Sequence, residues 1–126
     1  MPQASGSEAI AANVHVDLSI HQLRCAIILE DIEKDNGPTV CYKKSMYLKE
    51  IKQNHLNMML TQFNFKPSSG DVHNVSYEKL KYLEEKTDKT YLTCKKGDLL
   101  LLDLKTAHSA TPLKSGQRHI LWYYYQ

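Results

Sequence analysis

Apolar and polar positions divide the chain into two strand-rich ends and a helical middle. Val14, Val16 and Leu18 alternate with polar neighbours, which predicts a strand over 13–19, because successive strand side chains point to opposite faces. Other short apolar or β-branched runs predict further strands, over residues 23–32, 39–42, 90–94, 98–104, 106–111 and 117–125. Residues typical of turns and loops separate them, at 35–38, 95–97 and 112–116.

The middle of the chain has helical periodicity. Apolar residues recur three and four positions apart between 45 and 62, which predicts a helix there. Residues 63–74 contain the sequence Pro-Ser-Ser-Gly and predict a loop. A second helix is predicted over 77–86, with Ser76 as its N-cap and with Leu80 and Leu83 on one face.

This order of elements predicts one mainly β domain. A chain of 126 residues has the length of a single domain. Short strands joined by tight turns are typical of a small β-barrel or a two-sheet jelly roll. We expect residues 1–12, which are small and polar, to be a frayed lead-in, and 13–126 to form the domain. The helical insertion at about 45–86 is expected to act as a lid that sets substrate specificity.

Charge and apolar content argue against two classes of partner. Sixteen basic and fourteen acidic residues give a net charge of +2, and the lysines are scattered, so we expect no nucleic-acid partner. The longest apolar runs, at 26–29 and 99–102, are far too short to cross a bilayer, so no membrane partner is expected. The chain begins without the basic and apolar regions of a signal peptide, which favours a cytoplasmic protein. An odd number of cysteines without CxxC spacing predicts buried free thiols, at Cys25, Cys41 and Cys94.

The first candidate for chemistry is His15-Val16-Asp17. Residues two apart on a strand point to the same face, so the imidazole and the carboxylate can reach one metal ion. The motif alone is weak, because roughly one sequence in three of this composition contains HxD by chance. A polar strand face exposed to solvent is the alternative interpretation.

A second group strengthens the metal interpretation. His108 follows the leucine-rich strand, and Arg118 lies ten residues further on. Two histidines and one carboxylate bind one face of an Fe(II) octahedron and leave three positions open. A bidentate 2-oxo acid fills two of them and dioxygen the third, and a guanidinium suits the far carboxylate of that acid. His15, Asp17, His108 and Arg118 are therefore the candidate ligands and anchor.

From Asn13 onward the chain resembles the phytanoyl-CoA dioxygenase family of Fe(II)/2-oxoglutarate oxygenases. The resemblance rests on His15-Val16-Asp17, Asp35-Asn36-Gly37-Pro38-Thr39, Gly97-Asp98 with the leucine run to Asp103, His108 and Arg118. It implies a double-stranded β-helix, a jelly-roll or cupin-like barrel, with iron on His15, Asp17 and His108 and 2-oxoglutarate clamped by Arg118. The implied activity is hydroxylation of a C–H bond of a small-molecule substrate, with succinate and CO2 as coproducts and ascorbate as a candidate reductant. Since Asp17 is a carboxylate, the resemblance disfavours halogenation.

The chain also departs from the family pattern. Tyr42-Lys43-Lys44-Ser45-Met46 stands where the family often has Pro-Gly-Ser-His, and Ser109-Ala110-Thr111 follows His108, offering hydroxyl groups to 2-oxoglutarate. Only fourteen residues precede His15, so we expect an N-terminally shortened member or a fragment that lacks the usual N-terminal segment. Two alternatives therefore stay open. One is a non-catalytic β-barrel binding module or truncated inactive fragment that retains the motif, and the other is a cupin-like metal enzyme such as an isomerase.

Several other side chains receive structural interpretations. Four histidines without a partner at ligand spacing are expected at the surface or satisfied, namely His21, His55, His73 and His119. For Arg24, an exposed salt bridge is favoured over a contact with an anionic substrate in the pocket. Residues 122–125 are expected to pack on a strand and not to form a substrate box, and Met46, Met58 and Met59 to pack on a helix. The lysines at 43, 44, 49 and 52 are expected to form a solvated face.

Overall fold

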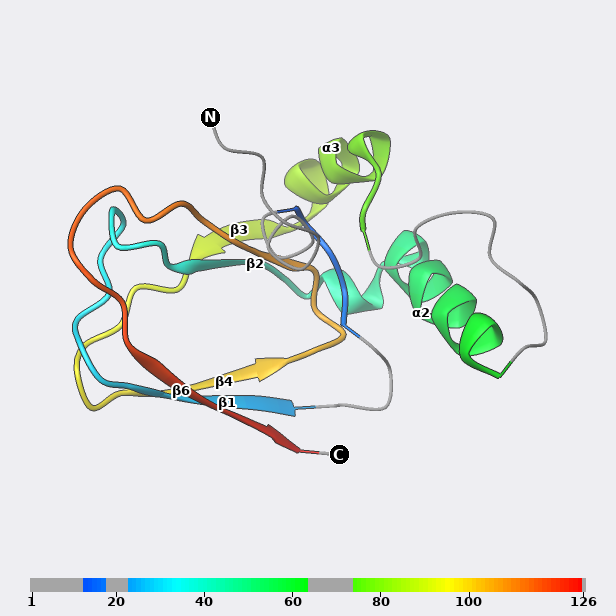
Figure 1. Ribbon diagram of the computed structural model, residues 1–126. Coiled ribbons are helices and arrows are strands. Elements are labelled where there is room, and N and C mark those ends of the chain that lie inside the picture. The colour runs from blue at the N-terminus through cyan, green and yellow to red at the C-terminus, as the bar shows by residue number, and fades with distance from the viewer. Residues whose placement is uncertain (1–12, 18–22, 64–73, 126) are drawn as a thin grey trace.

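The structure is a computed structural model that describes residues 13–17, 23–63 and 74–125 (Figure 1). The described part of the chain contains strands β1 (Leu23–Ile28), β2 (Thr39–Lys43), β3 (Asp88–Tyr91), β4 (Leu99–Asp103), β5 (His108–Ala110) and β6 (Ile120–Tyr125). Between β2 and β3 come a short 3-10 helix, η1 (Ser45–Tyr47), and two α-helices, α2 (Lys49–Gln62) and α3 (Tyr77–Lys86).

The strands form two antiparallel sheets, in the orders β4-β1-β6 and β3-β2-β5. Figure 1 shows the sheets as two layers, with α2 and α3 gathered on one side. The prediction of a mainly β fold with a helical insertion is confirmed. Among the described strands, no strand of one sheet pairs with a strand of the other, so these sheets do not close into a hydrogen-bonded barrel.

The sheet β4-β1-β6 is apolar on both faces. On the face toward the other layer, Ala26 and Ile28 are fully buried and pack with Ile32 and with side chains of the flanking strands: Leu100, Ile120 and Trp122. On the opposite face, Leu99 and Leu101 are 60% and 58% exposed. The alternation along each strand therefore separates a packed interior from an apolar outer face.

The sheet β3-β2-β5 supports the helices. Val40 and Tyr42 point to one face of β2 and are buried against Ile51 and Met58 of α2 and Leu83 of α3. Thr39 and Cys41 consequently point to the opposite face, toward the layer that contains β1. The helices therefore brace the outer side of this sheet. The expected N-cap of α3 is confirmed, because Ser76 Oγ accepts a hydrogen bond from the Lys79 N–H at 3.4 Å.

Three strand predictions differ from the structure where tertiary pairing competes with the local pattern. Over 13–17 there is no strand but an isolated bridge at His15, which pairs with Asn74 and His108, and residues 18–22 lie outside the described part. The strand predicted over 23–32 ends at Ile28, and Ile32 then bridges Cys94. Cys94 takes part in that bridge, so the strand predicted over 90–94 lies earlier in the sequence, as β3 (Asp88–Tyr91).

The helix predicted over 45–62 is also divided. Leu48 has ψ of 141°, which is extended, so η1 ends before it and α2 begins after it. The four lysines at 43, 44, 49 and 52 are exposed, as predicted. Cys25 and Cys41 are buried free thiols as expected, whereas Cys94 is only partly buried. Among the described residues, no helix is both long and apolar enough to cross a membrane.

Candidate metal centre

His15 and His108 lie directly opposite one another on two extended segments. The His15 N–H donates to the His108 carbonyl at 2.9 Å, and the His108 N–H donates to the His15 carbonyl at 3.0 Å. Residues that exchange both backbone hydrogen bonds project their side chains to the same face. The two imidazole rings accordingly lie 4.5 Å apart, centroid to centroid.

Asp17 completes the group that the sequence predicted. Its Oδ1 lies 3.4 Å from His15 Nε2, and its Oδ2 lies 3.4 Å from His108 Nε2. One ligand atom from each of the three residues can be chosen so that all lie within 4.8 Å of one another. Ligands at right angles around a metal at about 2.1 Å are about 3 Å apart, so a small closure of this cluster would accommodate one ion. The Asp17 N–H also donates to the Leu104 carbonyl at 3.3 Å, which fixes the backbone beneath the carboxylate.

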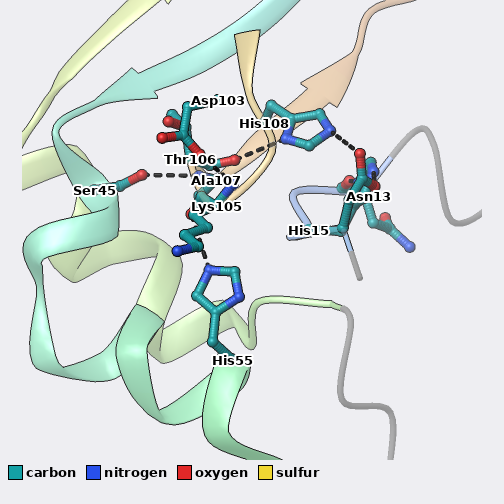
Figure 2. A network of polar contacts seen from close by, with 10 residues as sticks. Asn13, His15, Ser45, His55, Asp103, Lys105, Thr106, Ala107 and His108 are labelled. Carbon is teal, nitrogen blue, oxygen red and sulfur yellow. Dashed lines mark hydrogen bonds and ion pairs between the residues drawn. The ribbon is translucent and has the colours of Figure 1, made fainter. Parts of the chain in front are cut away.

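Backbone carbonyls fix the orientation of both imidazoles. His15 Nδ1 lies 2.7 Å from the Asn13 carbonyl oxygen, and His108 Nδ1 lies 2.7 Å from that of Thr106. Figure 2 shows the Thr106 contact. A carbonyl can only accept, so each Nδ1 carries the proton and each neutral ring presents its Nε2 lone pair toward Asp17. This is the arrangement that metal-bound histidines use, with the second nitrogen donating to a backbone carbonyl.

Two imidazole lone pairs facing a carboxylate require a positive charge between them. His108 Nε2 is fully buried and makes no hydrogen bond within the described structure. Either a proton on an imidazole or a cation can meet the requirement. The donor set of two imidazoles and one carboxylate, buried and correctly oriented, fits a divalent first-row metal such as Fe(II).

The pKa values of the cluster follow from the same geometry. Burial favours neutral His15, but the hydrogen bond and the charge of Asp17 outweigh it, so the pKa of His15 is raised above its ordinary value of 6.5. Burial also favours neutral Asp17, yet the imidazoles of His108 and His15, each able to bring a proton and positive charge toward this carboxylate, outweigh burial and hold its pKa far below its usual range. Asp17 is therefore ionised at neutral pH and able to bind a cation.

Arg118 is held by the turn predicted at 35–38. Its Nη1 donates to the carbonyl oxygen of Gly37. Gly37 has φ of 68°, and a Cβ there would lie 3.3 Å from Arg118 Nη1 and 3.0 Å from the Thr111 carbonyl oxygen. Glycine therefore permits both the turn and the close approach of the guanidinium. The remaining guanidinium N–H groups of Arg118 are able to contact a bound ligand.

The triad histidines and Arg118 meet in one pocket of about 180 Å³. Its walls also include Thr39 from β2, Arg24 from β1 and Trp122 from β6. No described residue of α2 or α3 lines it, so the expectation that the helical insertion covers the site is wrong for those helices. A larger cavity of about 730 Å³ lies between α2 and the turn after β4, is mostly apolar, and contains no member of the triad.

The structure changes the interpretation of several other side chains. Arg24 is half-buried in the pocket wall, so the expected exposed position is wrong, and Trp122 lines the same pocket although no substrate role was expected for it. Met58 is buried as predicted, whereas Met59 is 44% exposed and lines the larger cavity. His119 is exposed and pairs with Glu30, His55 Nε2 lies 3.1 Å from the Lys105 carbonyl oxygen, and His21 and His73 lie outside the described residues.

Sequence reasoning missed Thr39 as a pocket residue. It lies on the face of β2 that also carries Cys41, the register partner of His108. The signal available was its position directly after Asn36-Gly37-Pro38, the turn that holds Arg118. The hydroxyl expected at Thr111 has a structural partner instead, because Thr111 Oγ1 donates to the Pro38 carbonyl at 2.6 Å.

A family model described as phytanoyl-CoA dioxygenase (PhyH) matches residues 8–120. No curated protein matches the chain. The matched span covers most of the chain and contains His15, Asp17, His108 and Arg118.

Proposed function

Because this chain belongs to the phytanoyl-CoA dioxygenase family, we propose that it is an Fe(II)- and 2-oxoglutarate-dependent dioxygenase. The reaction would be hydroxylation of a C–H bond of a small-molecule substrate, with succinate and CO2 as coproducts. The two open sheets would be the frame of a double-stranded β-helix, with the metal and cosubstrate between them.

The arrangement of His15, Asp17 and His108 carries the proposal. Both imidazoles present Nε2 toward one ionised carboxylate, and each Nδ1 is held by a backbone carbonyl. Such a set occupies three positions on one face of the metal and leaves three open. These three residues would hold an Fe(II) ion, which would supply the oxidation chemistry, while the other pocket residues would orient the cosubstrate and the substrate.

The remaining pocket residues would position 2-oxoglutarate. Arg118 is the candidate for its far carboxylate, because a guanidinium offers two parallel N–H donors to two carboxylate oxygens. Gly37 sets the position of that guanidinium through its carbonyl. Thr39 contributes a hydroxyl on the same pocket wall. Ascorbate is a candidate reductant that would keep the iron in its ferrous state.

The decisive measurement is anaerobic titration with Fe(II) and then 2-oxoglutarate. A bidentate complex should give a weak visible charge-transfer band, and succinate should form once dioxygen and a substrate are present. Arg118→Ala should weaken 2-oxoglutarate binding without removing metal binding. Lys114→Ala removes an exposed cation that lies four residues earlier in the sequence and outside the pocket wall, and it should change neither.

The alternatives give different results in the same titration. Metal binding with an absorption spectrum insensitive to 2-oxoglutarate would favour a cupin-like enzyme of another chemistry. No metal uptake would favour a non-catalytic binding module. Formation of the ternary complex with succinate release at background for every substrate offered would indicate an inactive member that retains the site.

A further inference from the structure

Both arginines of the chain line the pocket that contains the triad histidines, His15 and His108. The sequence has two arginines and fourteen lysines, and within the described part of the chain no lysine contributes to this pocket wall. Arginine differs from lysine in presenting a planar fork that matches a carboxylate, and in being more easily desolvated. The placement of both arginines here indicates recognition of anions at two positions.

The two guanidiniums reach the pocket from different parts of the β4-β1-β6 sheet. Arg24 lies on β1 opposite Leu102 and Tyr124, whereas Arg118 precedes the start of β6 at Ile120, the partner of Ile28. Arg24 and Ile28 are four residues apart on β1, which corresponds to about 13 Å along a strand. The arginines therefore enter from opposite ends, and Trp122, the partner of Ala26, lies between them.

Arg24 is held over the indole ring of Trp122. The guanidinium carbon lies 4.2 Å from the ring centroid, a favourable distance for a cation–π contact. This contact holds the guanidinium of Arg24 beside Trp122 in the pocket wall. Arg24 also lines the same pocket as His15 and His108, so its guanidinium lies on the wall that faces the candidate metal ligands.

We propose that Arg24, supported by Trp122, binds a carboxylate of the primary substrate while Arg118 binds 2-oxoglutarate. This inference rests on the proposed function and adds a substrate class to it, a small carboxylic acid. The pocket of about 180 Å³ favours a compact acid. A carboxylate is favoured over a phosphate because its two oxygens match the planar fork in one plane. Arg24 would thus orient the C–H bond to be hydroxylated and would be a specificity-determining residue.

The single tryptophan provides a direct probe, because Trp122 is the only one in the chain and lies beneath Arg24. Protein loaded with Zn(II) and saturated with 2-oxoglutarate would be titrated with butyrate and, separately, with butyramide, its neutral counterpart. Butyrate should produce a saturable change in tryptophan emission, and butyramide should not. The apparent affinity for butyrate, read from this emission change, should fall at least tenfold in Arg24→Gln. It should be partly retained in Arg24→Lys, which keeps the cation.

Controls separate this inference from the proposed function. Calorimetric titration of 2-oxoglutarate into Zn(II)-loaded protein should show binding in wild type and Arg24→Gln, and loss of binding in Arg118→Gln. If wild type fails to bind 2-oxoglutarate, the proposed function is overturned. If 2-oxoglutarate binds but butyrate gives no response, or the response is unchanged in Arg24→Gln, the role of Arg24 is overturned. Tighter binding of inorganic phosphate than of butyrate would overturn the assignment of a carboxylate substrate. If Arg24→Gln loses 2-oxoglutarate binding and Arg118→Gln keeps it, Arg24 binds 2-oxoglutarate and the proposed roles of the two arginines are overturned.

Discussion

His15 and His108, whose imidazoles face the same candidate site, are also joined through their backbones, since each donates its N–H to the carbonyl of the other. The hydrogen bonds at 2.9 and 3.0 Å hold two segments that are distant in the sequence directly opposite one another. The imidazoles are therefore placed by a local backbone pair and do not require closure of the whole barrel. This explains how a preformed ligand cluster coexists with two sheets that remain separate in the described structure.

Removal of any one member of the triad should abolish specific metal binding. Asp17→Ala leaves two imidazoles without the carboxylate that faces both of them. We expect Co(II) affinity to fall by at least about 100-fold, because the loss of a direct ligand should exceed the 10- to 100-fold cost of losing an outer partner. Calorimetry with Co(II) measures this change. His119→Ala is the matched control, because His119 is exposed and pairs with Glu30. Equal losses in both variants would indicate nonspecific surface binding.

The candidate ligand cluster was predictable from the sequence because its chemistry is local. His15 and Asp17 are two residues apart, which fixes a common face whenever the segment is extended, and His108 and Arg118 follow in the order that the chemistry requires. The turn at 35–38 was predictable for a similar reason, since glycine readily adopts the positive φ that Gly37 has there.

The part of the pocket wall that Arg24 and Trp122 form could not be predicted in this way. Whether Arg24 meets Trp122 depends on the register between β1 and β6, which pairs Ala26 with Trp122. A shift of one residue would turn Arg24 to the outer face, and nothing in the alternation of either strand alone fixes that choice. The limits of β3 and of the segment at 13–17 depended likewise on distant partners, Ile32 with Cys94 and His15 with His108.

Metal affinity should fall as the solution becomes more acidic. Only neutral His15 can bind a metal, and its raised pKa means that protons compete at higher pH than for an ordinary imidazole. Below that pKa, we expect the apparent dissociation constant for Zn(II) to rise about tenfold per pH unit for each proton displaced. Asp17 should contribute no such dependence near neutrality, because its pKa is strongly lowered. Titrations in buffers of different ionisation enthalpy would count the protons released. A Zn(II) affinity that stays the same between pH 6 and pH 8 would contradict the assignment.

Gly37→Ala should impair 2-oxoglutarate binding through Arg118. The new Cβ would lie 3.3 Å from Arg118 Nη1 and 3.0 Å from the Thr111 carbonyl oxygen, at a backbone φ of 68°. The left-handed conformation should cost about 1–2 kcal/mol of unfolding free energy. Displacement of the guanidinium should weaken 2-oxoglutarate binding by about tenfold or more. Calorimetry on Zn(II)-loaded protein would measure this.

Gly97→Ala is the matched control for that experiment. Gly97 also has positive φ, 91°, but a Cβ there meets nothing within 4 Å. We therefore expect a comparable loss of stability with unchanged affinity for 2-oxoglutarate. If Gly37→Ala binds 2-oxoglutarate as tightly as Gly97→Ala does, the contact between Gly37 and Arg118 does not position the anchor.

Ser45→Ala should weaken both the fold and the metal site, because Ser45 holds the segment that precedes His108. Its Oγ is buried and accepts the Ala107 N–H at 2.8 Å, next to the Thr106 carbonyl that orients the His108 ring (Figure 2). Loss of the acceptor leaves a buried N–H without its partner, which should reduce the unfolding free energy by about 1–3 kcal/mol. Since Thr106 and Ala107 would shift together, we also expect Co(II) affinity to fall about tenfold, as for the loss of an outer partner of a ligand.

The control for Ser45 is Ser76→Ala, which removes a hydroxyl of equal size from the N-cap of α3. This variant should lose about 1 kcal/mol in urea unfolding, because one helical N–H loses its cap. Co(II) affinity should stay at the wild-type value, since α3 contributes no described residue to the pocket. If Ser45→Ala and Ser76→Ala lose similar stability but only Ser45→Ala loses Co(II) affinity, Ser45 has a positioning role at the site. If both variants bind Co(II) as wild type does, the orientation of His108 does not depend on the contact between Ser45 and Ala107.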